Sequence, residues 1–556
     1  MRMAAYAPPA GAPNLIEANS TQRLPPAGAP YPIEANRTQR LVAMSSGAYD
    51  AIIVGGGHNG LVCASYLARA GLRVLVLERR EILGGACVTE ELFPGFRFSA
   101  CSYYCHLLQS KVIDDLELRR HGFHVYHIDP QKCSLFPGDR ALVVWEDVER
   151  TQEAIGRFST HDAAAYPNWV RFWERAAGLI YPYFLKPAPT LAELAAGLRT
   201  ADDQAFLDAL VGASMEDVVT EFFEDEAVRG AFIQAHDAGD PAAPGSAWVY
   251  AYIKCNTFTP PENIGIVRGG MGAITAAMAA AARSLGVTVE TNAPIAGILV
   301  EHGAAVGVRL SGGGEVRSRL VASNADPKRT FLTLVGEQHL PAGFLRRVRR
   351  LKTNTAYFKF HAALNRLPDL SRYFGSDYDA RYLGYARISP SIGYFKQSWE
   401  DAKHGRPPRG PVMDIQIPSG YDPTMAPSGK HIMSIWALYA PVHPAEGTWD
   451  ERREEVGERM IDTLAQYAPD LPECIADWQL FTPQDIEARV GLTDGNIRHL
   501  DIVPGQFLAT RPMPGWAHYR TPIRGLYLCG AGTHPGGEVT GAPGHNAAQA
   551  MLADFR

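Results

Sequence analysis

Residues 50–60 read Asp50-Ala-Ile-Ile-Val-Gly-Gly-Gly-His-Asn-Gly60. The apolar run 51–54 predicts a short buried strand of the parallel-sheet kind. The glycines that follow predict a tight turn into a helix over 61–70. A second apolar run, 73–77, ends at an acidic residue. Strand, glycine turn, helix, strand and acid follow one another in the order of a dinucleotide-binding unit.

Each glycine of the motif has a separate expected role. Gly55 permits the turn, Gly57 lets the backbone approach a pyrophosphate, and Gly60 lets the helix pack on the strand. The first helical turn, with His58 and Asn59, offers free N–H groups to the phosphates. Glu78 is expected to accept hydrogen bonds from ribose hydroxyls and to repel a 2′-phosphate.

The residues after the acid indicate which dinucleotide is bound. Arg79 is followed by a glycine pair, Gly84-Gly85, and then by Ala86-Cys87. This arrangement resembles the FAD-binding enzymes of the glutathione-reductase superfamily. The disulfide reductases of that group carry a second cysteine five residues after the first, where this chain has Leu92. We therefore expect FAD as the cofactor, with Arg79, Gly84, Gly85 and Ala86 beside it. No redox-active disulfide is expected.

The C-terminal part of the chain predicts the other half of the cofactor site. Residues 525–529 read as a strand, residues 530–545 as a glycine-rich loop, and residues 546–552 as a helix. A helix N-terminus beside the flavin would favour reduction, because negative charge then develops at the ring's N1/C2=O edge.

These segments together resemble the phytoene-desaturase-like family, particularly its branch of pyridine nucleotide-disulfide oxidoreductase domain-containing proteins. The matching stretches include residues 55–71, 78–99, 268–282, 321–334, 491–501 and 511–551, and so cover nearly the whole chain from residue 50 onward. The resemblance implies further cofactor contacts at Ile295, Asn324, Ala325, Gly530, Ala531, Val539, Thr540 and Ala542. Ser99 and His545 depart from what relatives often carry, which bears on the substrate rather than the cofactor.

The expected fold is α/β, with a discontinuous Rossmann FAD domain of the glutathione-reductase type. Its parts are residues 48–110, 262–340 and 505–556. Residues 111–261 are expected to form a helical cap, and residues 341–504 a substrate-binding domain with a mixed sheet. Residues 1–47 contain a Pro/Ala-rich duplication, 9–24 repeated as 26–41, which is expected to be mobile or to lie across the surface.

Composition narrows the classes of partner and compartment. The net charge is −6 and no basic stripe occurs, so no nucleic-acid partner is expected. No apolar run approaches the roughly 18 residues that span a bilayer, although a peripheral membrane contact stays compatible with the sequence. The 8 cysteines contain no CxxC pair, which favours reduced thiols and a cytoplasmic location. The scattered histidines and acids predict no metal site.

Few residue types suggest acid–base chemistry. His534, His545 and Tyr104 are the candidate catalytic residues, because each lies close in sequence to a predicted flavin contact. One hypothesis is dehydrogenation, oxidation or isomerisation of a hydrophobic small molecule in an apolar cavity between the FAD and 345–500 regions. A second is amine-oxidase-like C–N oxidation with Trp516 and Tyr519 as an aromatic cage. A third is a non-catalytic lipid-binding escort of the same fold. No motif identifies the electron acceptor.

Overall fold

The computed structural model describes residues 49–375, 378 and 380–555. The duplicated segment 1–47 lies outside the described residues, so its expected behaviour stays a prediction.

A five-stranded parallel sheet carries the glycine motif, with the order β19-β13-β1-β2-β9. We call it the parallel sheet. Its strands come from three separate stretches of the chain: β1 (Ala51–Val54), β2 (Val74–Leu77), β9 (Thr288–Glu290), β13 (Leu320–Ser323) and β19 (Leu526–Leu528). The central strands are buried along their whole length, because both faces are covered.

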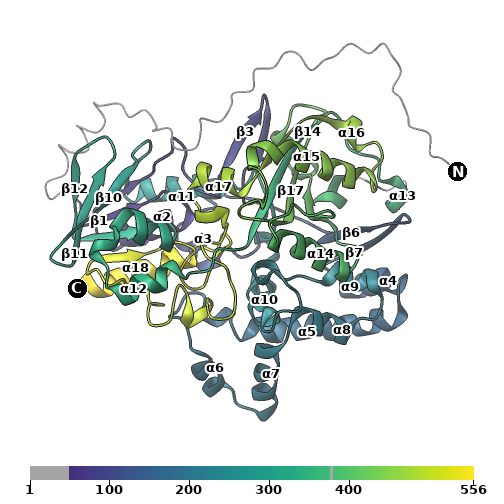
Figure 1. Cartoon of the computed structure of the whole chain (residues 1–556), viewed down its shortest axis with the longest axis horizontal. Coiled ribbons are helices and arrows are strands. Elements are labelled where there is room, and N and C mark those ends of the chain that lie inside the picture. Colours follow the sequence, from purple (N-terminus) through teal and green to yellow (C-terminus); the bar gives the residue numbers. More distant parts are fainter. Residues whose placement is uncertain (1–48, 376–377, 379, 556) are drawn as a thin grey trace. The chain divides into compact units, whose positions relative to one another are not determined.

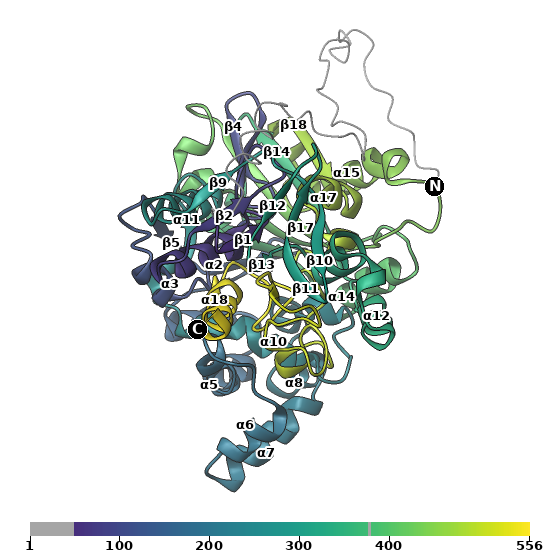
Figure 2. The ribbon, with the colours of Figure 1, turned by 90° about the vertical axis from the view of Figure 1, so that its left-hand side faces the viewer.

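Helices pack on one face of the parallel sheet, and antiparallel strands pack on the other. Alternate side chains of β1 and β2 pack in one core with α2 (His58–Arg69), α11 (Gly272–Ser284) and α18 (Ala542–Phe555). Figures 1 and 2 show α18 beside α2, although nearly the whole chain separates them in sequence. The other face packs on the antiparallel strands β10 (Ile295–Glu301), β11 (Ala304–Leu310) and β12 (Glu315–Arg317).

A second, mixed sheet has seven strands in the order β18-β14-β17-β16-β15-β6-β7. We call it the large sheet. Its strands are β6 (Lys132–Phe136), β7 (Arg140–Val144), β14 (Ala356–Leu364), β15 (Ala386–Ile388), β16 (Val412–Gln416), β17 (His431–Ala440) and β18 (Ile475–Phe481). One face is apolar and packs on α15 (Trp449–Ala465).

The segment 111–261, expected to be a helical cap, also contains strands. β5 (Val125–His127) pairs with β8 (Gly265–Val267), and β6 runs parallel to β15, so β6 and β7 extend the large sheet. Apart from α3 (Ser110–Asp115), the helices of this segment begin at α4 (Val148–Gly156). The pairing of β6 with β15 joins residues far apart in sequence, which local periodicity does not reveal.

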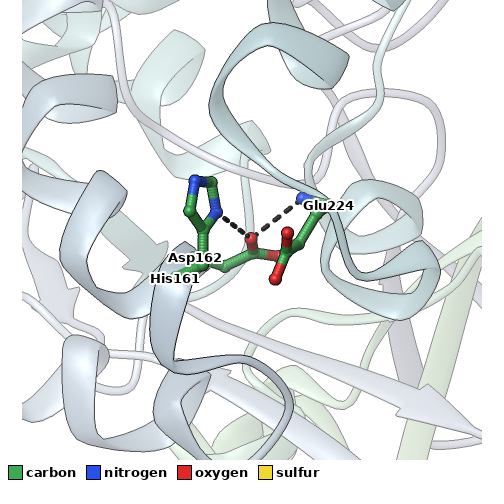
Figure 3. Close-up of side chains that lie close together, drawn as sticks. All are labelled: His161, Asp162 and Glu224. Atoms are coloured by element: carbon green, nitrogen blue, oxygen red, sulfur yellow. Dashed lines mark hydrogen bonds and ion pairs between the residues drawn. The ribbon is translucent and has the colours of Figure 1, made fainter.

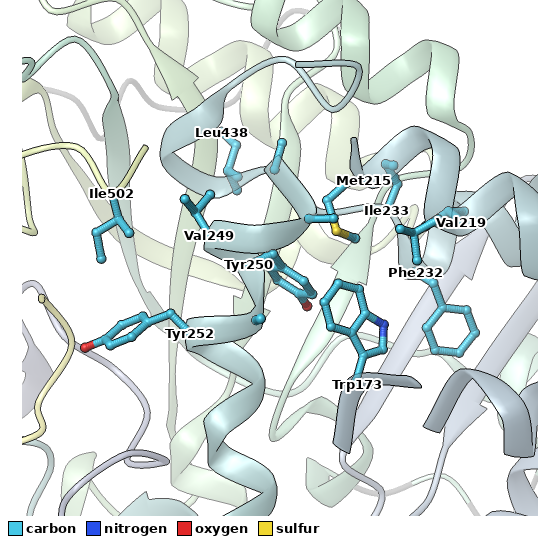
Figure 4. Close-up of a cluster of buried hydrophobic side chains, with 14 of the residues drawn as sticks. Trp173, Met215, Val219, Phe232, Ile233, Val249, Tyr250, Tyr252, Leu438 and Ile502 are labelled. Carbon is cyan, nitrogen blue, oxygen red and sulfur yellow. The ribbon is translucent and has the colours of Figure 1, made fainter. Parts of the chain in front are cut away.

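The helices between residues 148 and 254 build an aromatic core, as the helical spacing of their aromatic residues indicates. It joins α5 (Thr160–Gly178), α8 (Met215–Phe222) and α10 (Ser246–Lys254) to the large sheet through Leu438. Figure 4 shows Tyr250 of α10 beside Trp173, with Tyr252 pointing away from this pair. Within the described residues, no helix is both long and apolar enough to cross a bilayer.

Candidate functional site

The glycine motif forms a tight turn between β1 and α2. Gly55 has φ +98°, a conformation that side chains disfavour. A Cβ on Gly60 would lie 2.2 Å from the Gly55 carbonyl oxygen, so only glycine fits there. At Gly57, a Cβ would meet the Asn324 amide at 2.6 Å. The turn therefore brings backbone without side chains to the N-terminus of α2, a position suited to phosphate groups.

Glu78 lies buried at the end of β2, where the ribose assignment requires an acid. Its Oε2 accepts from the Gly56 amide at 2.8 Å, and its Oε1 accepts from the Arg80 amide at 2.9 Å. The Ala293 amide donates to the Glu78 carbonyl at 2.8 Å, which places the start of β10, with Ile295, beside this strand end. A carboxylate has further lone pairs, so Glu78 can still accept from two vicinal hydroxyls.

The glycine pair Gly84-Gly85, which follows Glu78, lies against the glycine turn. The Gly84 amide donates to the Gly56 carbonyl at 2.9 Å, and Gly84 and Gly85 both have positive φ, +124° and +59°. Ala86 is half-buried beside them. Arg79, in contrast, donates from its guanidinium to the carbonyls of Ala488 and Arg489 at 3.0 Å each. Its side chain therefore ties the parallel sheet to α17 (Pro483–Val490).

Asn324 and Ala325 close the turn from β13. The Asn324 amide donates to the Val54 carbonyl at 2.8 Å, and the side chain lies against Gly55, Gly57 and Gly60. The Ala325 amide donates to Ser323 Oγ at 3.3 Å.

Residues 529–541, which we call the C-terminal loop, connect β19 to α18 beside this turn. A Cβ on Gly544 would lie 2.1 Å from the Asn59 carbonyl, so the first turn of α18 lies directly against the first turn of α2. Buried Arg511 donates to the Ala531 carbonyl from Nε at 3.1 Å and NH2 at 2.7 Å, next to Gly530. Thr540 lies between Val539 and Ala542 in the sequence, and its carbonyl accepts a hydrogen bond from the Gln109 amide at 3.1 Å.

The residues of this region fit FAD. Two helix N-termini converge on bare glycine backbone, and an acid stands at the ribose position. His58 Nε2 and Asn59 Oδ1 are buried and have no hydrogen-bond partner within the described chain. Burial lowers the pKa of His58 to about 4, so the ring is neutral and can donate or accept one hydrogen bond.

The candidate catalytic histidines have structural contacts. His545 lies edge-on to Tyr66, and its Nδ1 is 2.8 Å from Asn546 Oδ1. Asn546 donates to Tyr519 Oη at 2.9 Å, and Tyr519 donates to the His534 carbonyl at 3.2 Å. His534 Nε2 is 2.8 Å from the Tyr183 carbonyl, and burial lowers the His534 pKa to about 4. This series of hydrogen bonds connects the C-terminal loop to α18 and to Tyr183, which follows α5 in the chain.

The proposed cage of Trp516 and Tyr519 is not formed. Tyr519 packs in the core of α2 and α18, with its hydroxyl in the chain of bonds just described. Trp516 packs against Phe344 on the opposite face of the parallel sheet, with ring centroids 5.1 Å apart. Tyr104 lies elsewhere, near Tyr385 and His106, at ring distances of 6.2 and 5.5 Å.

The structure reveals a buried ionic network that the sequence analysis did not find. Arg498 donates to Glu538 Oε1 from Nε at 3.0 Å and NH2 at 2.6 Å, and to Asp237 Oδ1 at 2.8 Å. Tyr357 of β14 donates to the same Asp237 oxygen at 3.0 Å. His106 lies 3.6 Å from Glu538 Oε2. The network joins the C-terminal loop, the large sheet and the helices.

Electrostatics and backbone conformation both distinguish Glu538. Burial alone would raise the Glu538 pKa, but the charges of Arg498 and His106 hold it well below its usual range. Glu538 has φ +62°, which is uncommon for a residue other than glycine. Its carboxylate bonds Arg498, and the next residue in the chain is Val539, a candidate flavin contact. Glu538 lies in the glycine-rich loop predicted over 530–545, but its partners are distant in the sequence.

One group of possible metal ligands lies together among the described residues: His161, Asp162 and Glu224 (Figure 3). The Asp162 oxygens accept from the amides of Glu224 at 2.8 Å and Asp225 at 3.0 Å, and Oδ1 also faces His161 Nδ1 at 3.0 Å. These bonds join α5 to the turn before α9 (Glu226–Phe232), which accounts for the buried carboxylate.

Comparison with known proteins agrees with the site. The family described as flavin containing amine oxidoreductase matches residues 60–552. The chain is 35% identical to pyridine nucleotide-disulfide oxidoreductase domain-containing protein 2 of Rattus norvegicus, over 91% of this chain and 94% of that one. It is 27% identical to a neurosporene-forming phytoene desaturase of Cereibacter sphaeroides, over 92% and 96%. The structure of cyclohexylamine oxidase from Brevibacterium oxydans shares the fold, with a TM-score of 0.54, 15% identity and coverage of 91% and 99%.

Proposed function

Because the chain belongs to the flavin-containing amine oxidoreductase family and its cofactor is FAD, we propose that it dehydrogenates a C–H bond of a largely hydrophobic organic molecule. Bound FAD supplies a hydride acceptor. The protein's own contribution is to hold the cofactor, to orient the substrate and to exclude water.

The observation that carries this proposal is the position of the C-terminal loop. Glu538 and the neighbouring Gly537 belong to this loop, which contains the candidate flavin contacts. Arg498 donates hydrogen bonds both to Glu538 and to Tyr357 on the large sheet. Tyr252 of α10 donates a hydrogen bond to the Gly537 carbonyl at 2.6 Å. The candidate flavin loop therefore meets the large sheet and the aromatic helices at one place, which is where we infer that substrate binds.

The aromatic side chains around this place support an organic substrate with apolar surface. Tyr103, Tyr104 and Tyr385 keep part of their surface accessible and lie near one another. Lys359 Nζ lies over the rings of both Tyr103 and Trp436, which is on β17. The similarity to a phytoene desaturase supports C–H rather than C–N oxidation. The order of the parallel sheet and the antiparallel strands β10–β12 support the finer assignment of a glutathione-reductase-type FAD domain.

The experiment is anaerobic reduction of the purified flavoprotein. Candidate hydrophobic substrates are mixed with it one at a time, and the visible absorbance of the flavin is followed. Bleaching by an alkene- or alcohol-type substrate, with product of two fewer hydrogens, is the expected result. A protein that neither carries nor takes up FAD would contradict the proposal and favour the escort hypothesis. Reduction by simple amines alone would favour C–N oxidation.

A further inference from the structure

The large sheet is apolar on one face, and its other face combines polar and charged side chains with aromatic and aliphatic ones. Along β14, Phe358 and Phe360 pack in the core with α15, while Tyr357, Lys359 and His361 occupy the alternate positions. The same alternation places polar or charged residues on this second face of the neighbouring strands. They are Ser434 on β17, Asp414 and Gln416 on β16, Arg387 beside them on β15, and Lys132 and Ser134 on β6.

Strand register aligns several of these residues in one row. Lys359 is opposite Trp436, Trp436 is opposite Asp414, and Asp414 is opposite Arg387. Neighbouring strands are about 4.8 Å apart, so the row extends over roughly 14 Å. A cation, an aromatic ring, an anion and a second cation therefore follow one another across the sheet. All four side chains are buried.

Many polar atoms on and around this face have no hydrogen-bond partner among the residues that the structure describes. Lys359 Nζ and Arg387 Nε are the charged examples. The uncharged examples are Ser134 Oγ, Trp173 Nε1, Gln234 Oε1, Ser389 Oγ, Gln416 Nε2 and Tyr439 Oη. Proteins normally satisfy buried polar groups, so such a concentration indicates a surface that serves a polar ligand.

The two cations of the row differ in their partners. Arg387 donates to Asp414 Oδ1 at 2.9 Å, so that pair is close to neutral. Lys359 has no anionic partner in the described chain, and its Nζ lies over the rings of Tyr103 at 4.6 Å and Trp436 at 4.8 Å. A buried ammonium held only by aromatic faces is costly, and an incoming anion would offset that cost. Burial lowers the Lys359 pKa to about 7, so binding of an anion would also favour its protonation.

A series of aromatic contacts leads from this row to the C-terminal loop. Tyr103 and Tyr104 both lie near Tyr385, with ring centroids 6.4 and 6.2 Å away. Tyr104 lies 5.5 Å from His106, which in turn faces Glu538. An elongated molecule could thus have one end at Lys359 and its apolar part along these rings.

We propose that this face of the large sheet binds the polar end of the substrate, and that this end is a carboxylate held by Lys359. The inference rests on the proposed function and specifies its substrate class as an amphipathic acid. An amine is disfavoured here, because its cation would meet Lys359 and Arg387, and Asp414, the carboxylate of the row, already pairs with Arg387.

The test is equilibrium binding, which requires no turnover. The FAD-loaded protein is titrated calorimetrically at pH 6.5 with decanoate, decanol and decylamine, which share one chain length. Decanoate should bind about 10-fold or more tighter than decanol, since a charge-assisted hydrogen bond contributes about 1.5–3 kcal/mol. Decylamine should bind most weakly. Decylamine binding as tightly as decanoate, or no decanoate binding up to its solubility limit, would overturn the proposal.

Variants of Lys359 test whether this lysine binds the carboxylate of decanoate. Lys359→Met should weaken decanoate binding about 10- to 100-fold and leave decanol within about 3-fold. Lys403→Met is the control, because Lys403 is an exposed lysine at the end of α14 (Ile392–Lys403) and lies outside this face. It should bind decanoate like the wild type. Lys359→Gln gives the same comparison if the Met variant misfolds, as judged by near-UV circular dichroism.

The outcomes separate this inference from the proposed function. Unchanged decanoate affinity in folded Lys359 variants would sink the carboxylate assignment, whereas flavin reduction by a neutral hydrophobic substrate would leave the proposed function intact. Tight decanoate binding, combined with no flavin reduction by any of the candidate hydrophobic substrates, would support the recognition site and contradict the dehydrogenase.

Discussion

Arg498 presents two nitrogens, Nε and NH2, to a single oxygen of Glu538, at 3.0 and 2.6 Å. The second oxygen of Glu538 is thereby left to face His106 at 3.6 Å. Arg498 follows α17 in the chain, and Glu538 lies in the C-terminal loop beside the candidate flavin contacts. This buried ion pair therefore connects the C-terminal loop to the segment after α17, which contacts the large sheet through Tyr357.

Removal of Arg498 should strongly destabilise the protein. Arg498→Met leaves Glu538 and Asp237 as buried carboxylates without their cation, which typically costs about 3–5 kcal/mol. Chemical denaturation of the holoprotein measures the change. The double variant Arg498→Met/Glu538→Gln should be less destabilised than the sum of the two single changes. Simple additivity would contradict a direct coupling.

Glu78→Ala should lower the affinity for FAD by about 1–3 kcal/mol, because ribose hydroxyls lose a charged acceptor. Titration of the apoprotein with FAD, followed by flavin fluorescence, measures it. Glu81→Ala, a change at an exposed acid three positions on, is the control and should bind FAD like the wild type. Equal affinities for both variants would show that the ribose lies elsewhere.

Gly544→Ala should separate the first turns of α2 and α18. The added Cβ would lie 2.1 Å from the Asn59 carbonyl, so the two helices must move apart. We expect FAD to be lost on gel filtration and the melting temperature to fall. Gly212→Ala, in α7 (Ala201–Gly212), meets nothing within 4 Å and should melt no lower than the wild type. Retention of FAD by Gly544→Ala would show that this helix contact is dispensable.

Lys359→Met should stabilise the protein at neutral pH. The Lys359 pKa is about 7 in the folded chain, against 10.5 for a lysine free in water, because burial disfavours the ammonium. Between these values the unfolded chain binds more protons, so the wild-type free energy of unfolding rises with pH across this window. The variant lacks this rise. Its advantage, a few kcal/mol near pH 7, should therefore shrink toward pH 10 in paired denaturation curves. An advantage independent of pH would contradict a buried ammonium.

Cys87→Ser should leave flavin reduction within a few-fold of the wild type. Cys87 is a free, buried cysteine whose Sγ donates to the Met271 carbonyl at 3.2 Å, and burial raises its pKa to about 12. A protonated thiol is a poor nucleophile. Stopped-flow reduction with FAD bound is the measurement. Loss of reduction by orders of magnitude would reinstate thiol chemistry.

Residues 50–78 and 525–545 show how far the sequence could predict the candidate site. The strand, the glycine turn, the helix and Glu78 are a local pattern, and the structure places them as that pattern requires. Arg79 was expected beside the cofactor from the same pattern, yet its guanidinium bonds the end of α17. The direction of a long side chain depends on what packs against it, which local sequence does not encode.

The sequence by itself determined the cofactor, because FAD recognition depends on short backbone motifs in which glycine is required by φ or by close approach. It also contained, in the alternation of Tyr357, Lys359 and His361 with phenylalanine, the period of a strand with one polar face. Only the tertiary structure decided where that face lies. The row from Lys359 to Arg387 depends on pairing between strands distant in the chain, and the Arg498–Glu538 pair depends on two loops that fold against each other. Register and burial are properties of such long-range packing, and they convert ordinary charged residues into a candidate substrate site.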